Sequence, residues 1–353
     1  MLLDDLGYND TFEQFRIDQK LDDYEIGRVI IENKGRYIVR TAESVYDSEI
    51  FGTMRYRAEN RVDYPAVGDW VAVIPSGTDL AIIHHIFPRK SIIERQSVGK
   101  FGKKQIIASN VDYAFIIQAV ETDFNINRLE RYLTISNSSN VEPIIVLTKI
   151  DLITKVELKK ILQEVKERVV DILTIPISNK TKKGYELFDT VFMKGKTYCF
   201  LGSSGAGKST LINNLSGEEL MVTDSINAIT HKGRHVTSHR ELTVLSSGGI
   251  LIDNPGMREV GVTDTTSGLE ETFDDIIELS HNCRFSDCSH THEKDCSVLS
   301  AVENGEINKT SYENYLRLGR EKTHFQSSVV EKRRKDKQFG KTIKAYLKNK
   351  KKG

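Results

Sequence analysis

The sequence of 353 residues predicts a multidomain α/β protein, with a β-barrel first, a doubly wound α/β domain in the middle and an α-helical metal-binding domain last. Three observations predict this architecture. Short apolar runs separated by turn residues fill 26–95, strand and helix patterns alternate over 105–262, and three cysteines gather within 263–330. A chain of this length also exceeds one ordinary core, which favours several domains.

The composition excludes several classes of protein. Lys plus Arg and Asp plus Glu number 50 each, so the formal net charge is zero. The N-terminus has no basic segment followed by an apolar core, and no apolar run approaches the roughly 18 residues of a membrane span, so we expect neither a signal peptide nor a transmembrane helix. Four cysteines in this pattern favour the reducing cytoplasm and a metal site over a disulfide framework, with Cys199 as a buried apolar residue.

The first hundred residues are expected to hold an extension, a barrel and a linker. Residues 1–25 are acidic with an apolar stripe, which predicts a helical docking segment. The strand spacing over 26–95 is typical of a five-stranded barrel of oligonucleotide-binding (OB) type, with Trp70 in its core. Such barrels often bind single strands through basic and aromatic residues. The candidates are Arg55, Tyr56, Arg57 and Arg61, for which a plain surface role is the alternative. Residues 89–104 are interpreted as a basic linker.

The strongest motif lies in 197–215, where an apolar strand, the pattern G-x-x-x-x-G-K-S and a helical apolar repeat follow one another. This context is what a phosphate-binding loop requires, and a flexible glycine turn is the alternative. Backbone N–H groups of such a loop wrap an anion, and the following helix adds the positive end of its dipole. Lys208 is expected to reach the β- and γ-phosphates, and the Ser209 hydroxyl to ligate Mg²⁺. The predicted binding set is Gly202, Ser203, Ser204, Gly205, Ala206, Gly207, Lys208, Ser209 and Thr210.

A second motif predicts the base. Thr148-Lys149-Ile150-Asp151 follows a buried strand, and ligands of such sheets bind at the carboxyl ends of strands. The carboxylate of Asp151 can accept both the N1–H and the 2-amino group of guanine, a pair that adenine lacks. The Lys149 stem would cover the base, and Ser178, after the next strand, would help to position a backbone N–H on guanine O6. A helix-capping aspartate is the alternative for Asp151.

Two further segments resemble the switches of GTPases. The run Asp253-Asn-Pro-Gly256 ends a strand as D-x-x-G, so Asp253 would hold Mg²⁺ through water and the Gly256 N–H would face the γ-phosphate. A sharp turn after a strand is the alternative. A switch threonine that completes the Mg²⁺ shell is expected within 232–238, and Thr237 is our choice.

The order of these motifs is the reverse of that in an ordinary GTPase. The base-reading motifs come first, the phosphate loop second and the switches last, which predicts a circularly permuted GTPase domain. The segment 253–256 leads directly into the C-terminal domain, so we expect a γ-phosphate-dependent movement to act on that domain.

The C-terminal cysteines and histidines have the composition of a closed zinc site. Cys283, Cys288, His290 and Cys296 supply a Cys₃His set within 14 residues, with His292 as the rival histidine and unliganded thiols as the alternative. Helices are expected at 272–280 and 312–322. Residues 331–353 form a basic tail, which favours a polyanionic binding partner, and a solvated lysine-rich end is the alternative.

Taken together, these features resemble the RsgA family, the small-ribosomal-subunit-dependent GTPases of bacteria. The resemblance depends on the permuted order, the run Asp-Phe-Asn-Ile-Asn-Arg-Leu-Glu-Arg-Tyr-Leu at 123–133, Gly-Arg-His at 233–235, Asp-Asn-Pro-Gly at 253–256 and Cys-x₄-Cys-x-His-x₅-Cys. It implies a GTP hydrolase that acts late in small-subunit maturation, is stimulated by the subunit, and touches rRNA through its barrel and zinc domain. It also implies GTP or GDP, Mg²⁺ and one structural Zn²⁺ as ligands. We expect a monomer, with no membrane or DNA partner.

The chain departs from the family pattern at the switches. Asn254 stands where the family usually has Thr, and Gly-Arg-His-Val-Thr-Ser leaves Thr237 and Ser238 as alternative switch ligands. Met257 occupies the place of a water-orienting Gln, so slow intrinsic hydrolysis is expected. His235 resembles the family's proposed substitute, with a structural histidine as the alternative, so the expected catalytic residues are Lys208, His235 and Thr237. Two rival functions are an RNA-binding assembly module with GTP as a conformational ligand, and a zinc-dependent P-loop ATPase on DNA, against which Thr148–Asp151 argues.

Overall fold

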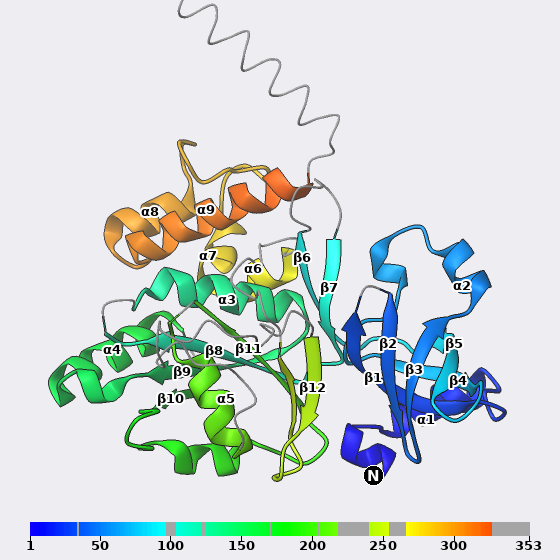
Figure 1. Ribbon diagram of the computed structural model, residues 1–353. Coiled ribbons are helices and arrows are strands. Elements are labelled where there is room, and N and C mark those ends of the chain that lie inside the picture. The colour runs from blue at the N-terminus through cyan, green and yellow to red at the C-terminus, as the bar shows by residue number, and fades with distance from the viewer. Residues whose placement is uncertain are drawn as a thin grey trace, which may run out of the picture.

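The computed structural model has the multidomain α/β architecture that the sequence predicts (Figure 1). A small barrel lies at one end, the α/β domain occupies the middle, and a helical unit packs on one side of the α/β domain. The residues that the structure describes are 1–33, 35–96, 104–121, 124–169, 171–203, 205–217, 240–253 and 266–326.

Five strands close the N-terminal barrel. Their bounds are β1 (Glu25–Asn33), β2 (Arg36–Thr41), β3 (Val45–Ile50), β4 (Trp70–Pro75) and β5 (Leu80–Ile86). The order is β1-β2-β3-β5-β4, and β4 pairs back with β1, which removes both free edges. Alternate side chains such as Val29, Val39 and Ile83 fill the interior and are fully buried. Helix α2 (Gly52–Arg57) and the 3₁₀ turn η2 (Arg61–Asp63) connect β3 to β4, so the OB-type prediction is confirmed.

The N-terminal extension packs on this barrel as predicted. It consists of η1 (Leu3–Leu6) and α1 (Asp10–Asp18), whose first turn is capped by the Asn9 side chain. Leu6 and Phe12 are buried against Trp70 and Phe87 of the barrel. Trp70 itself is fully buried, in agreement with the predicted core role.

The interpretation of 89–104 as a linker is wrong for its described part. Strands β6 (Ile92–Gln96) and β7 (Lys104–Ser109) pair in an antiparallel hairpin. Ile93 is fully buried and Ala108 joins the same core as the α/β domain. The basic residues dominate the composition of this segment, whereas a few buried apolar residues fix the hairpin on the core.

The α/β domain is a mostly parallel sheet covered by helices. Its strands are β8 (Tyr113–Ala119), β9 (Glu142–Thr148), β10 (Thr174–Pro176), β11 (Thr197–Gly202), β12 (Arg240–Val244) and β13 (Ile250–Asp253). The order is β10-β9-β8-β11-β13-β12, and β12 is the antiparallel member. The helices are α3 (Ile126–Ser138), α4 (Lys155–Arg168) and α5 (Lys208–Ser216), with 3₁₀ turns η3 (Ile150–Leu152) and η4 (Tyr185–Thr190). Cys199 is buried, as expected, and burial raises the pKa of its thiol.

Two contacts join the barrel to the α/β domain. Strand β12 pairs with β1 through Ile31–Glu241 and Glu32–Arg240, so the two sheets are continuous. Beside them the fully buried Arg28 donates hydrogen bonds to three backbone carbonyls, those of Leu6, Gly68 and Asn110. Burial lowers the pKa of Arg28 to about 10, and the three carbonyls lie in the extension, the barrel and the start of the α/β domain.

The C-terminal unit is helical and packs on α3. Its helices are α6 (Thr266–Thr272), α7 (Asp274–Ser280), α8 (Ser297–Asn304) and α9 (Lys309–Gln326), of which α6 and α8 were not predicted. The buried carboxylate of Glu130 on α3 accepts hydrogen bonds from Arg168 of α4 and from Ser311 and Asn314 of α9. Among the described residues, every helix is too short or too polar to pass through a bilayer.

Candidate functional site

The phosphate loop connects β11 to α5 at the carboxyl end of the parallel sheet. The helix begins at Lys208 after Gly207, whose backbone is left-handed with φ +86°. Gly202 approaches β8 so closely that a Cβ there would lie 2.3 Å from the Ile117 carbonyl oxygen. N–H groups in the first turn of a helix have no intrahelical acceptor. These groups and the positive end of the helix dipole can therefore bind an anion at this turn.

The Lys208 ammonium lies inside this loop. It donates hydrogen bonds to the carbonyl oxygens of Gly202 at 2.7 Å and Ser203 at 2.5 Å. Both carbonyls belong to the predicted phosphate-binding loop itself. Ser209 and Thr210 occupy the first turn of α5, and Ser204 lies outside the described residues.

The predicted base-reading motif contacts the predicted phosphate loop directly. Thr148 ends β9, is fully buried, and its hydroxyl donates a hydrogen bond of 2.6 Å to the Ala206 carbonyl. Lys149 adopts a left-handed backbone with φ +62°, and its ammonium lies 3.6 Å from the Glu121 carboxylate. Two segments that are 58 positions apart in the chain are therefore joined by one buried hydrogen bond.

The carboxylate of Asp151 is held by Ser178, another residue of the predicted base-reading set. The buried Ser178 hydroxyl donates to Asp151 Oδ1 at 2.6 Å and accepts from the Thr181 N–H at 3.0 Å. Asp151 itself is exposed, and the Ser178 contact engages one of its two carboxylate oxygens. The arrangement leaves carboxylate acceptor capacity for a ligand that offers two adjacent donors.

One residue of this region was not selected from the sequence. Asn179, next to Ser178, donates from Nδ2 to the Gly207 carbonyl at 2.9 Å. No sequence signal points to it, because asparagine is common in turns and its partner is a backbone oxygen.

The predicted switch residues can be followed only in part. Asp253 ends β13, where its backbone pairs with Glu241. His235, Thr237, Ser238, Gly256 and Met257 lie outside the described residues. Their roles stay predictions.

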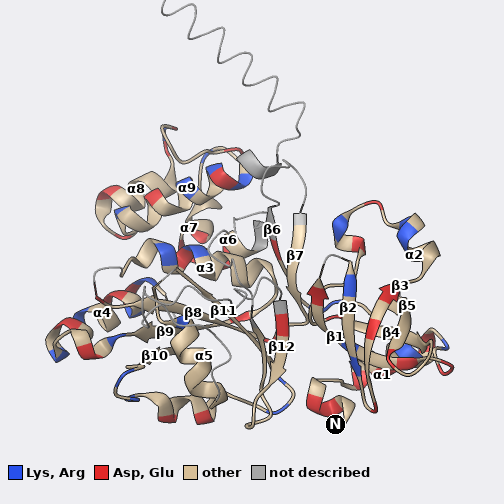
Figure 2. Cartoon of the chain, in the orientation of Figure 1, with Lys and Arg blue, Asp and Glu red and all other residues tan. Residues whose placement is uncertain are grey.

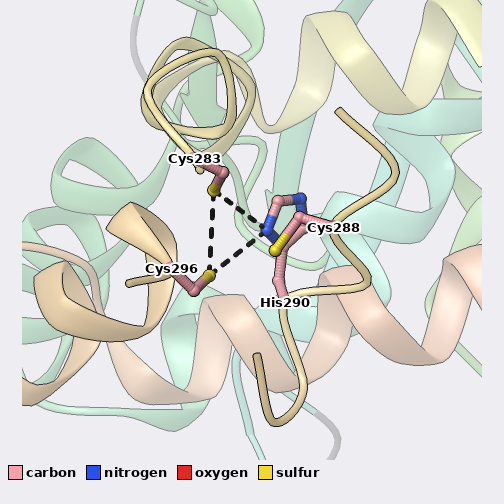
Figure 3. A group of neighbouring side chains, drawn as sticks. All are labelled: Cys283, Cys288, His290 and Cys296. Carbon is pink, nitrogen blue, oxygen red and sulfur yellow. Dashed lines mark hydrogen bonds between the residues drawn. The ribbon is translucent and has the colours of Figure 1, made fainter. Parts of the chain in front are cut away.

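The Cys₃His set forms a compact cluster between α7 and α8 (Figure 3). The four ligand atoms of Cys283, Cys288, His290 and Cys296 lie within 4.8 Å of one another. Cys283 Sγ is 3.8 Å from Cys296 Sγ, and His290 Nδ1 is 3.6 and 3.5 Å from these two sulfurs. A tetrahedral ion with metal–sulfur bonds of about 2.3 Å and a metal–nitrogen bond of about 2.0 Å requires separations of roughly 3.8 and 3.5 Å. The donor set therefore fits a tetrahedral metal ion.

The surroundings fix the cluster in place. The His290 carbonyl accepts a hydrogen bond of 2.6 Å from the Tyr312 hydroxyl of α9, and the Leu299 N–H donates to Cys296 Sγ at 3.4 Å. Burial lowers the pKa of His290, which favours the neutral imidazole that binds metals. The rival His292 is exposed and its Nδ1 contacts the Thr291 hydroxyl, so the structure brings His290 and not His292 into the cluster.

Comparisons with known proteins give one family. The RsgA GTPase family model matches residues 86–263. The chain is 38% identical over 348 residues to "Small ribosomal subunit biogenesis GTPase RsgA 1" of Bacteroides thetaiotaomicron, an alignment that covers 98% of this chain and 96% of the relative. It is 37% identical over 309 residues to "Small ribosomal subunit biogenesis GTPase RsgA" of Methanosarcina acetivorans, with coverages of 87% and 82%.

Solved structures agree with the permuted order of motifs. The fold is similar to that of YjeQ from Thermotoga maritima, with a TM-score of 0.61, 26% identity, and coverage of 83% of this chain and 96% of that one. It is equally similar to YloQ, "a circularly permuted GTPase", with a TM-score of 0.61, 25% identity, and coverages of 86% and 97%. The chain belongs to the RsgA GTPase family and is a circularly permuted GTPase that hydrolyses GTP.

Proposed function

We propose that this GTPase acts in the maturation of the small ribosomal subunit, with its guanine nucleotide bound by Thr148–Asp151, Ser178 and the phosphate loop. The hydrogen bond from Thr148 to the Ala206 carbonyl is the main support for this nucleotide site, because it joins a base-reading segment to a phosphate-binding one. The names of the relatives, which are small-subunit biogenesis GTPases, support the ribosomal role.

Asp151 reads the base in this proposal. Its carboxylate accepts the N1–H and 2-amino donors of guanine, and Ser178 holds it in place through the 2.6 Å hydrogen bond. Lys149 covers the base with its stem. A carboxylate without its two donors would be left poorly solvated, which disfavours adenine.

The phosphate loop binds the polyphosphate through its backbone N–H groups. Lys208 exchanges its two carbonyl contacts for phosphate oxygens, which hold a larger negative charge. Ser209, Thr237 and, through water, Asp253 would hold Mg²⁺, with Ser238 as the alternative to Thr237. When bound, this ion offsets charge on the β- and γ-phosphates. His235 would orient the attacking water, and the Gly256 N–H would face the γ-phosphate.

The four-residue cluster would hold one structural Zn²⁺. All four protein ligands are present, which leaves no open position for a substrate. Because Cys283 follows α7, Cys296 caps α8 and Tyr312 of α9 bonds the His290 carbonyl, the ion would fix three helices relative to one another.

Contact with rRNA would involve the barrel. Arg55, Tyr56 and Arg57 are exposed on α2, and Tyr56 is 92% exposed. In Figure 2 the basic colour marks α2, which lies on the side of the barrel away from the α/β domain. Cations with an exposed aromatic ring suit a single-stranded segment of RNA. The protein would work on the subunit as a monomer in the cytoplasm.

Turnover of GTP, measured with and without purified small subunits, tests the proposal. We expect slow hydrolysis by the protein alone and strong stimulation by the small subunit. Nucleotide-dependent co-sedimentation without stimulation would instead favour an assembly module in which GTP is a conformational ligand. For the RNA surface, Arg55→Glu with Arg57→Glu should weaken co-sedimentation, whereas Lys159→Glu with Lys160→Glu on the exposed face of α4 serves as the charge-matched control.

A further inference from the structure

The loop after β10 carries an asparagine that the nucleotide motifs do not assign. We propose that Asn179 is a positioning residue that ties the base-reading loop to the phosphate loop, so that the sites for the two ends of a guanine nucleotide keep a fixed spacing. The inference rests on the proposed nucleotide-binding function of this site.

The contact between the two loops is close. Asn179 Nδ2 donates to the Gly207 carbonyl at 2.9 Å, and Gly207 directly precedes the first residue of α5. A Cβ on Gly207 would lie 2.7 Å from the same Nδ2 atom. The asparagine therefore reaches the phosphate loop at a separation that only glycine allows.

Two further side chains set the direction of the Asn179 amide. The Tyr185 hydroxyl donates to Asn179 Oδ1 at 2.7 Å. Asn214 of α5 donates from Nδ2 to the Tyr185 hydroxyl at 2.8 Å and to the Asn179 carbonyl at 3.3 Å. Because Oδ1 is the acceptor from Tyr185, Nδ2 must face Gly207. Burial raises the pKa of Tyr185, so its hydroxyl stays a donor.

These bonds form a continuous path across the site. Asp151 is bonded to Ser178, Ser178 is followed by Asn179, and Asn179 is bonded to Gly207. In parallel, Thr148 bonds the preceding carbonyl, that of Ala206. Both base-reading segments thus hold successive carbonyls of the phosphate loop. Loss of one tie lowers the fraction of molecules in the binding-competent arrangement, and the apparent Kd rises by the inverse of that fraction.

Nucleotide affinity of the full-length, metal-loaded chain tests this role. We expect Asn179→Ala to raise the Kd for GDP and for a non-hydrolysable GTP analogue by the same factor, about tenfold, which corresponds to about 1.4 kcal/mol. Asn179→Asp should raise it further, because a carboxylate oxygen would then face the Gly207 carbonyl. Tyr113→Phe is the control that matches the Tyr185→Phe variant described below. Tyr113 is a partly buried tyrosine on β8 whose hydroxyl bonds to no described residue.

A double-mutant cycle separates positioning from general stability. If Tyr185 acts through Asn179, Tyr185→Phe should raise the Kd by itself and add nothing in the Asn179→Ala background. Should Asn179→Ala fail to fold, Tyr185→Phe alone still tests the role of Asn179. It removes only the hydroxyl oxygen that donates to Asn179 Oδ1 and so weakens the orientation of that amide. The inference is overturned if Asn179→Ala binds both nucleotides as tightly as the Tyr113→Phe control, or if the two effects add. A wild-type chain that binds no guanine nucleotide would instead overturn the proposed function of the site.

Discussion

Replacement of Glu130 by alanine would test how the helical C-terminal unit is held on the α/β domain. The Glu130 side chain is 1% exposed. Its Oε1 accepts hydrogen bonds from Arg168 at 2.9 and 2.6 Å and from Ser311 at 3.3 Å, and its Oε2 accepts from Asn314 at 2.5 Å. The substitution leaves the guanidinium of Arg168, 7% exposed, without its carboxylate.

The magnitude follows from this burial. Removal of one partner of a buried ion pair costs about 3–5 kcal/mol, because the other charge stays buried and uncompensated. Arg131, the next residue of α3, supplies the comparison. It forms a bidentate pair with Glu321 of α9 at 2.6 Å, but these side chains are 29% and 22% exposed. Solvent screening limits such a pair to about 1 kcal/mol, so Glu130→Ala should cost at least about 2 kcal/mol more than Arg131→Ala.

Urea denaturation followed by circular dichroism measures both variants at a fixed zinc concentration. Addition of Arg168→Ala to Glu130→Ala should recover part of the loss, since it removes the orphaned charge. If Glu130→Ala costs no more than Arg131→Ala, or if the two alanines simply add, the Glu130 carboxylate is not the buried anchor between α3, α4 and α9 that its hydrogen bonds indicate.

Four other outcomes are expected. Asp151→Asn should abolish the preference for GTP over ATP in competition binding, while Asp189→Asn on the exposed face of η4 should not change it. Lys208→Ala should remove turnover in a phosphate-release assay, and residual turnover near the wild-type rate would contradict its role. Cys296→Ser should lower the zinc content measured by atomic absorption and lower the melting temperature, because the ion would fix three helices. Burial raises the pKa of Glu130 above its ordinary 4.5, so the folded chain binds that proton more tightly than the unfolded chain. Wild-type stability relative to Glu130→Gln should therefore rise as the pH falls from the raised pKa towards 4.5, and urea midpoints from neutral pH down to about pH 4.5 measure this.

The parts of the fold that sequence could predict are those with a regular pattern or a motif. The strands that flank Gly202–Ser209 and the helix that follows them are present, and the barrel closes with the expected number of strands. The four metal-ligand candidates follow from residue type and spacing alone, and they lie together in the structure.

Other features depend on contacts that no local pattern encodes. The hairpin β6–β7 is anchored by Ile93 and Ala108 against a core built from distant segments, so its charged composition misleads. Helix α8 follows an N-cap cysteine, Cys296, whose sulfur accepts a hydrogen bond from the Leu299 N–H, and cysteine is not one of the ordinary capping residues. Asn179 was missed because its partner is a backbone carbonyl 28 positions away.

The pairing of β12 with β1 has a mechanical consequence. Main-chain hydrogen bonds span the junction at Ile31–Glu241 and Glu32–Arg240, and Arg28 joins the barrel to the start of the α/β domain through the carbonyls of Gly68 and Asn110. A hinge motion at this place would have to break the β1–β12 hydrogen bonds and leave the buried guanidinium of Arg28 without its acceptors. The barrel and the proposed nucleotide site are therefore held at a fixed distance, and a surface that engages both must match that distance.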